Sequence, residues 1–418
     1  MSLTRQVVES ATEALGLVLR FDFPADGVLS RYFQQHHSLG QKDRAFVAEA
    51  IYAVLRHKRG LDHLTGNATP RRLLLAAATR YSGVSVRELG SALTPAEAEW
   101  LAGLKGISLD GLPPAVRAEL PDWIYARLET RLPESEILAL GRAMQDPAPL
   151  DLRVNTVRSD RDTVLRVLAE SGVRAEPTPH SPIGVRIGGK PALSRHPLFL
   201  AGAVEVQDEG SQLIGYLVAP RRRDLVVDFC AGAGGKALML GAMMGSHGRV
   251  YAFDVSAARL ARLKPRLKRS GLSNLHPYLL RNENDIKVKR LARKIDRVLV
   301  DAPCTGFGTL RRNPDLKWRQ TPESVAELQV KQAAILRAAA GLVKAGGRLV
   351  YATCSLLSEE NEDIIEAFLS EHLEFSLQSS AGLLSQHGIA VEAEPYLRLW
   401  PQIHGTDGFF AAVLERAV

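Results

Sequence analysis

The stretch VVDFCAGAGGKALML, residues 226–240, contains a short apolar strand, a turn with three glycines and the start of an apolar helix. Glycines at such a turn let the backbone approach a ligand closely. The helix N-terminus offers unpaired N–H groups and the positive end of the helix dipole. Further short strands, RVYAF, HPYLL, RVLVDA and GRLVYAT, follow and are separated by helical stretches. This alternation predicts an α/β fold built on a doubly wound, mostly parallel sheet.

Two regions precede this sheet. Residues 1–145 are predicted to be helical, because apolar residues recur at helical spacing in VVESATEALGLVL and AFVAEAIYAVLRHKRGLDHL. Residues 146–215 alternate strand and helix, with LDLRVNTV as a strand and DTVLRVLAESG as a helix, and predict a small α/β module. We therefore expect three domains, with the sheet domain at 216–418.

The composition is that of a globular protein with an anionic partner. The 418 residues are 46% hydrophobic and 24% charged, contain no apolar run of the ~18 residues that a membrane-spanning helix needs, and lack a secretory signal at the start. Three cysteines without a Cys-x-x-Cys pair favour a reducing, cytoplasmic location and no metal site. The net charge of +7, with basic clusters at 221–223, 262–269 and 287–294, favours a nucleic acid as partner.

The glycine turn is a candidate cofactor site. Its N–H groups would suit the carboxylate of the methionine half of S-adenosylmethionine. The second strand ends in Asp254, about 20 residues after the glycines, where an acid can bond ribose hydroxyls. A tight turn without a ligand and a nicotinamide cofactor are the alternatives, but Gly-x-Gly-Gly lacks the full nicotinamide pattern.

All three cysteines follow strands of the predicted sheet. Cys230, Cys304 and Cys354 come directly after VVDF, RVLVDAP and RLVYAT. Ligands of open α/β sheets bind at the carboxyl ends of the strands. We therefore expect the three thiols at the functional edge of one sheet.

A thiol beside a methyl donor suits the chemistry of cytosine. Carbon 5 of cytosine is a poor nucleophile until a thiolate adds to carbon 6 and makes the ring enamine-like. After methyl transfer a base removes the proton on carbon 5 and the thiolate leaves. Asp301, three residues before Cys304, is placed to bond the exocyclic amine and the protonated ring nitrogen, unless it only caps a turn.

Several motifs resemble those of a known family. DAPCTG (301–306), ATCS (352–355), HGTDGFF (404–410), RRNPDLKW (311–318) and VQDEGSQL (206–213) together resemble the RNA cytosine-carbon-5 methyltransferases of the Sun/Fmu (RsmB-like) family, over roughly residues 147–416. The resemblance implies a Rossmann-like class I methyltransferase domain after a small RRM-like subdomain. LGQKDRAFVAEAIYAVLR also resembles the family's NusB-like RNA-binding domain.

The resemblance also implies roles for individual residues. It implies Cys354 as nucleophile and Cys304 in release of the methylated RNA, although residue chemistry alone leaves the choice of nucleophile open. The expected cofactor or base contacts are Cys230, Ala231, Gly232, Ala233, Gly234, Gly235, Lys236, Asp254, Arg259, Asn282 and Asp301, with Asp285 as the alternative to Asn282. The loop departs from the family's usual Cys-Ala-Ala-Pro-Gly-Gly-Lys, because alanine stands in place of proline.

We therefore expect an S-adenosylmethionine-dependent enzyme that methylates carbon 5 of cytosine in RNA. The leading substrate is 16S-type ribosomal RNA. The enzyme is expected to act as a monomer without an obligate protein partner. Transfer RNA, DNA and a non-catalytic role in ribosome assembly are the alternatives. Trp318 is expected either to stack on RNA or to pack inside the protein, and His404 to shape a turn. The acidic run SEENED, residues 358–363, is expected to begin an exposed helix.

Overall fold

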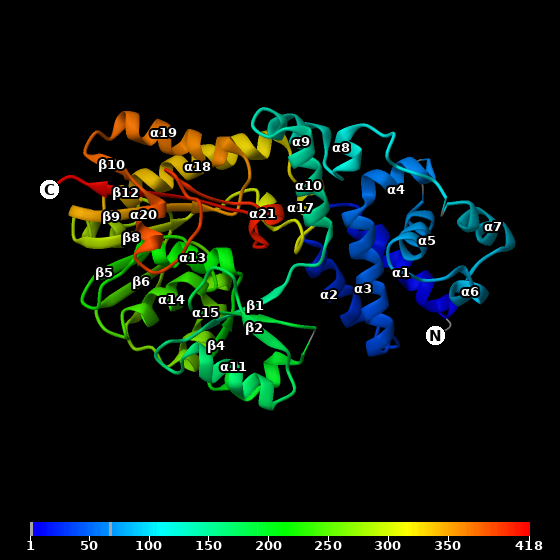
Figure 1. The fold of residues 1–418 in the computed structure, drawn as a ribbon, viewed down its shortest axis with the longest axis horizontal. Coiled ribbons are helices and arrows are strands. Elements are labelled where there is room, and N and C mark those ends of the chain that lie inside the picture. The colour runs from blue at the N-terminus through cyan, green and yellow to red at the C-terminus, as the bar shows by residue number, and fades with distance from the viewer. Residues whose placement is uncertain (1–2, 67–68, 105, 190) are drawn as a thin grey trace. The chain divides into compact units, whose positions relative to one another are not determined.

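The chain divides into two compact units in the computed structural model, which describes residues 3–66, 69–104, 106–189 and 191–418 (Figure 1). Unit 1 comprises Met1–Pro147 and Thr309–Pro322, and unit 2 comprises Ala148–Gly308 and Glu323–Val418. No helix in these described ranges has the length and apolar character that crossing a membrane requires.

Unit 1 is helical, as its apolar spacing predicts. The side chains that recur on one face of each helix, such as Val8, Leu15 and Ile51, are buried in a common core. Thr4 caps the first helix by accepting a hydrogen bond from the backbone N–H of Val7. The elements are α1 (Arg5–Val18), α2 (Ala25–Gln35), α3 (Gln41–Arg56), α4 (Lys58–Thr65), α5 (Pro70–Arg80), α6 (Val86–Leu89), α7 (Pro95–Leu104), α8 (Pro114–Arg117), α9 (Asp122–Glu129), α10 (Glu134–Gln145) and α17 (Leu316–Arg319).

The short helix α17 reaches unit 1 from far along the sequence and supplies part of its core. The Trp318 ring packs against this core, and its indole N–H donates to the carbonyl of Leu55 at 3.0 Å. The buried Lys317 ammonium donates to the carbonyls of Arg56 and Glu119 at 2.8 and 2.7 Å. Of the two roles expected for Trp318, the structure places it in packing.

Unit 2 begins with a small antiparallel sheet of order β2-β3-β1-β4. Leu152 and Val185 on its strands pack against Val164 and Leu168 of its helix, which forms a separate apolar core. The elements are β1 (Leu150–Val154), α11 (Arg161–Glu170), β2 (Ala175–Pro177), β3 (Gly184–Ile187), α12 (Pro197–Leu200) and β4 (Val204–Val206). This is the α/β module expected from the sequence.

The larger sheet has the order β10-β12-β9-β8-β5-β6-β7. Its strands from β9 to β7 are parallel, and β12 runs antiparallel between β9 and β10. The bounds are β5 (Leu225–Asp228), β6 (Arg249–Asp254), β7 (Leu275–Leu279), β8 (Ile295–Asp301), β9 (Val343–Thr353), β10 (Phe375–Gln378), β11 (Leu397–Leu399) and β12 (Phe409–Arg416). The predicted strands are therefore present and mostly parallel.

Helices cover both faces of this sheet (Figure 1). Successive strand residues point to opposite faces, so Val226 packs with α13, α14 and α15 while Val227 packs with α18 and α19. The helices are α13 (Glu209–Val218), α14 (Gly235–Met243), α15 (Ala257–Ser270), α16 (Ile286–Arg290), α18 (Pro322–Ala340), α19 (Glu362–Glu371), α20 (Ser380–Ser385) and α21 (Pro401–His404). The parallel strands thus deliver their carboxyl ends to one edge.

Candidate active site

The glycine turn between β5 and α14 forms a loop with two residues in the left-handed region. Gly232 and Gly234 have φ of +56° and +83°, a conformation that favours glycine. Asp254, the last residue of β6, accepts hydrogen bonds from the N–H groups of Gly232 and Ser256 at 2.8 and 2.7 Å. The acid expected to bond ribose therefore also fixes the loop that begins the site.

Two arginines hold this loop from outside the motif. Arg153 of β1 is buried and donates to the carbonyl of Gly235 at 2.6 Å. Arg266 of α15 donates to the carbonyl of Ala233 at 2.7 Å and pairs with Glu205 of β4. Sequence reasoning missed both residues. The partners of Arg153 and Arg266 lie 82 and 33 positions away along the chain, which no local pattern reveals.

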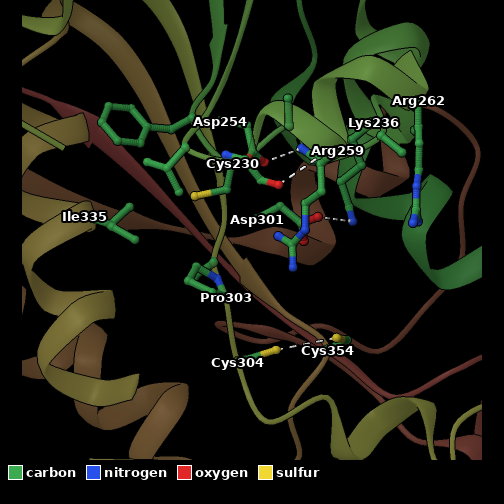
Figure 2. A pocket seen from close by; sticks show the side chains of 18 of the residues that line it. Cys230, Lys236, Asp254, Arg259, Arg262, Asp301, Pro303, Cys304, Ile335 and Cys354 are labelled. Carbon is green, nitrogen blue, oxygen red and sulfur yellow. Dashed lines mark hydrogen bonds and ion pairs between the residues drawn. The ribbon is translucent and has the colours of Figure 1, made fainter. Parts of the chain in front are cut away.

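A cavity of about 790 Å³ opens between the glycine loop and the cysteine-bearing strand ends (Figure 2). Its volume lies within the ~300–1,000 Å³ range of small-molecule sites. Among the predicted site residues, it is lined by Cys230, Ala231, Gly232, Ala233, Gly235, Lys236, Asp254, Arg259, Asp301, Cys304 and Cys354. Residues from four separate motifs therefore meet in one place.

Asn282, one of the expected cofactor or base contacts, does not line the cavity, and neither does its alternative Asp285. The side-chain oxygen of Asn282 accepts from the backbone N–H of Asn284 at 2.9 Å. The alternative, Asp285, caps α16 through the N–H of Lys287. Glu283, between them, lines the cavity. Gly234 is likewise outside the lining because it faces α15.

The two cysteines of the Pro-Cys and Thr-Cys motifs are adjacent. They follow β8 and β9, which pair in parallel, and their sulfur atoms are 3.4 Å apart. The hydrogen bond with Cys354 and burial together raise the pKa of Cys304 well above its ordinary value. Burial and the nearby Asp228 also raise the pKa of Cys230. Cys304 and Cys230 are therefore thiols at neutral pH.

Lys236 and Asp301 form an ion pair inside the cavity, with 2.8 Å between Nζ and Oδ2 (Figure 2). Burial opposes the ammonium charge, but the Asp301 carboxylate outweighs it, so the pKa of Lys236 rises above its ordinary value. The Asp301 side chain is 31% exposed and can still reach a ligand. The Lys236 ammonium is thus held, paired with the Asp301 carboxylate, in the cavity that Cys304 and Cys354 also line.

Asp228, the last residue of β5, is a further acid that sequence reasoning missed. It is buried, and burial together with the charge of Asp301 raises its pKa to about 8. It is therefore mostly protonated at pH 7. Its place at the end of the strand that begins the glycine loop was the available signal.

The acidic run after Cys354 is not the exposed helix that we expected. Glu360, Asn361 and Glu362 are all buried, and α19 begins only at Glu362. The expectation was wrong because the Glu360 carboxylate accepts a hydrogen bond and the Asn361 amide donates one inside the protein, so their polarity did not mark a solvent-facing segment.

The late motif lies near the end of the chain. His404 ends α21, where its Nδ1 accepts from the backbone N–H of Trp400 at 3.0 Å, and it does not line the cavity. It shapes a turn, as expected. Phe409 and Phe410 begin β12 and are buried in the core.

Comparisons with known proteins identify the family. The description 16S rRNA methyltransferase RsmB/F matches residues 215–415, and a ferredoxin-like domain of RsmF/B-like methyltransferases matches residues 120–193. The probable ribosomal RNA small subunit methyltransferase B of Synechocystis is 32% identical and covers 98% of this chain and 100% of its own length. This chain belongs to the RsmB/F family.

Other relatives agree. The ribosomal RNA small subunit methyltransferase B of Erwinia tasmaniensis is 30% identical, over 91% of this chain and 92% of its own. The solved structure of PH0851 superposes with a TM-score of 0.80 at 26% identity and covers 100% of both chains. The resemblance drawn from the motifs is therefore confirmed. As an RsmB/F member, the chain is an RNA methyltransferase that uses a cofactor of the S-adenosylmethionine type.

Proposed function

We propose that this RsmB/F enzyme methylates carbon 5 of a cytosine in small-subunit ribosomal RNA, through a covalent bond between Cys354 and carbon 6. The observation that carries the proposal is the pair of sulfur atoms, 3.4 Å apart, in the cavity that also holds the glycine loop. Methylation of an amine or a hydroxyl would not need a thiol pair at this place. The relatives, which are named as small-subunit ribosomal RNA methyltransferases, support ribosomal RNA as the substrate.

The cavity fits S-adenosylmethionine. The left-handed glycine at 232 has no heavy atom within 4 Å of an added Cβ, so the loop leaves open space there. Asp254 lies beside it and would bond the ribose, and the N-terminus of α14 would bind the carboxylate of the methionine half. When bound, the cofactor supplies a methyl group on a positively charged sulfur.

The protein residues then carry the covalent steps. The Cys354 thiolate forms a bond to carbon 6, and the ring electron pair moves to carbon 5, which takes the methyl group. Asp301, held by Lys236, bonds the exocyclic amine and the protonated ring nitrogen and so stabilises the charge of the adduct. Loss of the carbon 5 proton to a base restores the double bond and expels Cys354. Cys304, a neutral thiol, assists this release.

The test is methyl transfer from labelled cofactor to 16S ribosomal RNA, transfer RNA and DNA. Cys354→Ala should abolish labelling, and Cys304→Ala should accumulate an RNA–protein band that survives denaturing gels. The double variant should lose that band, because Cys354 forms the bond.

The remaining outcomes are informative. An RNA–protein band that persists only when Cys354 is replaced would mean that Cys304 is the nucleophile and that Cys354 assists release. Labelling of transfer RNA alone would show that transfer RNA, and not ribosomal RNA, is the substrate. Cofactor binding without labelling of any nucleic acid would refute the catalytic proposal and favour an assembly role.

A further inference from the structure

A buried carboxylate lies beneath the two cysteine loops. Glu360 of the short 3-10 turn η4 (Ser358–Glu360) has none of its surface exposed. Its Oε1 accepts from the backbone N–H of Thr305 at 2.9 Å, and its Oε2 accepts from the hydroxyls of Thr305, at 2.5 Å, and Ser355. Thr305 follows Cys304 and Ser355 follows Cys354. One side chain therefore binds the residue after each cysteine.

Neighbouring amides complete this arrangement. Gln332 of α18 donates to Glu360 Oε1 at 3.0 Å and to the carbonyl of Pro303 at 2.9 Å. Asn361 donates to the carbonyl of Ser355 at 3.1 Å. The loops also bond directly, from the N–H of Gly308 to the carbonyl of Cys354 at 2.8 Å. The two loops are thus tied to one another and to the same acid.

Neutral side chains could tie two loops together with less desolvation, so the charge of Glu360 needs a reason. A fully buried carboxylate is costly unless several donors compensate it, and here four donor hydrogen bonds do so. Such a charge acts on nearby thiols in a medium of low dielectric. Its effect on a thiol is to disfavour the thiolate.

The charges around the pair are unequal. The pKa of Cys304 is raised by the hydrogen bond with Cys354, by burial, and by the charges of Cys354 and Glu360. The positive charge of Lys236, paired with Asp301, lies on the side of Cys354.

Two weaker acids complete the surroundings. Tyr351 of β9, beneath the loops, donates its hydroxyl to the Glu360 carbonyl at 2.7 Å, and its pKa is raised by burial and then by Cys304 and Glu360. Cys230, which is a thiol, lies at the far end of the cavity (Figure 2). Among the carboxylates, it is Glu360 that raises the pKa of Cys304, and Asp301 is paired with Lys236.

We propose that Glu360 is a positioning residue for the cysteine pair: it holds the two loops at their mutual distance and keeps Cys304 as the protonated member. This inference rests on the proposed function, in which the Cys354 sulfur alone bonds to carbon 6. A Cys304 thiolate would compete for that atom. Glu360 thus selects which of two adjacent sulfurs attacks.

The charge is tested by alkylation without RNA or cofactor. The three cysteines fall in different tryptic peptides, so iodoacetamide rates can be followed for each by mass spectrometry as the pH is varied. Glu360→Gln keeps an acceptor for Thr305 N–H and Gln332, and its amide can donate to the two hydroxyls. We expect the alkylation midpoint of Cys304 to fall by about one pH unit, with rates up to about tenfold higher below it.

Glu366→Gln is the matched control, because it removes the same charge from the exposed side of α19. Its Cys304 midpoint should equal that of the wild type. An unchanged midpoint in Glu360→Gln, or an equal shift in Glu366→Gln, would overturn the electrostatic part of the proposal.

The positioning of the two cysteine loops by Glu360 is tested by measuring turnover. Glu360→Ala and the milder Thr305→Val should lower kcat by about tenfold or more, while the KM for RNA and the cofactor affinity change less than twofold, because neither side chain lines the cavity. A kcat near that of the wild type in Thr305→Val and in folded Glu360→Ala would refute the positioning role.

The alkylation measurement does not depend on methyl transfer. A shifted Cys304 midpoint in a protein that never labels RNA would reject the proposed function and leave the effect of Glu360 on the thiols standing. Labelling in the wild type together with an unshifted midpoint in Glu360→Gln would reject the inference alone.

Discussion

The two left-handed glycines of the cofactor loop offer a matched pair of substitutions. An added Cβ at position 234 would lie 2.1 Å from Leu263 Cδ1, whereas at position 232 it would meet no heavy atom within 4 Å. Both residues have positive φ, so alanine at either position costs about 1–2 kcal/mol of backbone strain. The two substitutions therefore differ in packing and not in backbone conformation.

The expected magnitudes follow from this difference. Gly234→Ala adds overpacking of about 1–3 kcal/mol against α15 to the strain, a total of roughly 2–5 kcal/mol. At roughly 2–4 °C per kcal/mol, the midpoint of thermal unfolding should fall by roughly 4–20 °C. The unfolding midpoint of Gly232→Ala should fall by roughly 2–8 °C, from backbone strain alone.

The affinity for the cofactor should fall more in Gly232→Ala than in Gly234→Ala, which is the reverse of the order expected for stability. The methyl group of Gly232→Ala projects into the open space of the cavity, so calorimetric titration with S-adenosylhomocysteine should show affinity reduced by about tenfold or more at a modest loss of stability. Equal shifts of the unfolding midpoint would refute the packing argument. Unchanged affinity in Gly232→Ala would refute the placement of the cofactor.

Three further results are expected. Lys317→Met should destabilise unit 1 by about 3 kcal/mol in urea unfolding, because it leaves the buried Glu119 without its compensating charge; an unchanged midpoint would contradict this. Because the pKa of Asp228 is raised in the folded state, its contribution to stability is lost as the pH rises from 3.8 toward about 8. The stability of Asp228→Asn relative to the wild type should therefore increase over this pH range in unfolding scans. Stability curves of the two proteins that stay parallel across the range would contradict this. Diamide should link Cys304 to Cys354 and stop turnover until a reductant is added; a disulfide that includes Cys230 in non-reducing peptide mapping would contradict this.

Much of the site could be predicted because parallel strands end at a common edge. Asp254, Asp301, Cys304 and Cys354 each follow a short apolar run, and the rule that such ends meet brings them together without knowledge of any contact. The glycine loop was predictable for the same reason. Its strand, turn and helix are local in the sequence.

The supports of the site were not predictable in this way. Glu360 was expected at the surface because local polarity is the signal that a sequence offers, yet its donor Thr305 lies 55 positions away. For Trp318 the sequence left stacking on RNA and packing both open, because its partner Leu55 lies 263 positions away, and the partner of Lys317, Glu119, lies 198 positions away. Only the folded chain brings such pairs together.

The return of the chain into unit 1 at 309–322 has a consequence for synthesis. About 160 residues separate Pro147 from Thr309, and at about 5–20 residues per second the ribosome needs roughly 8–32 s to make them. During that interval the first helices lack Trp318 and the lysine that their carbonyls bind. The core of the N-terminal unit is therefore incomplete until residues 309–322 have been synthesised. A nascent chain halted before residue 309 would leave this incomplete core accessible to chaperones and proteases.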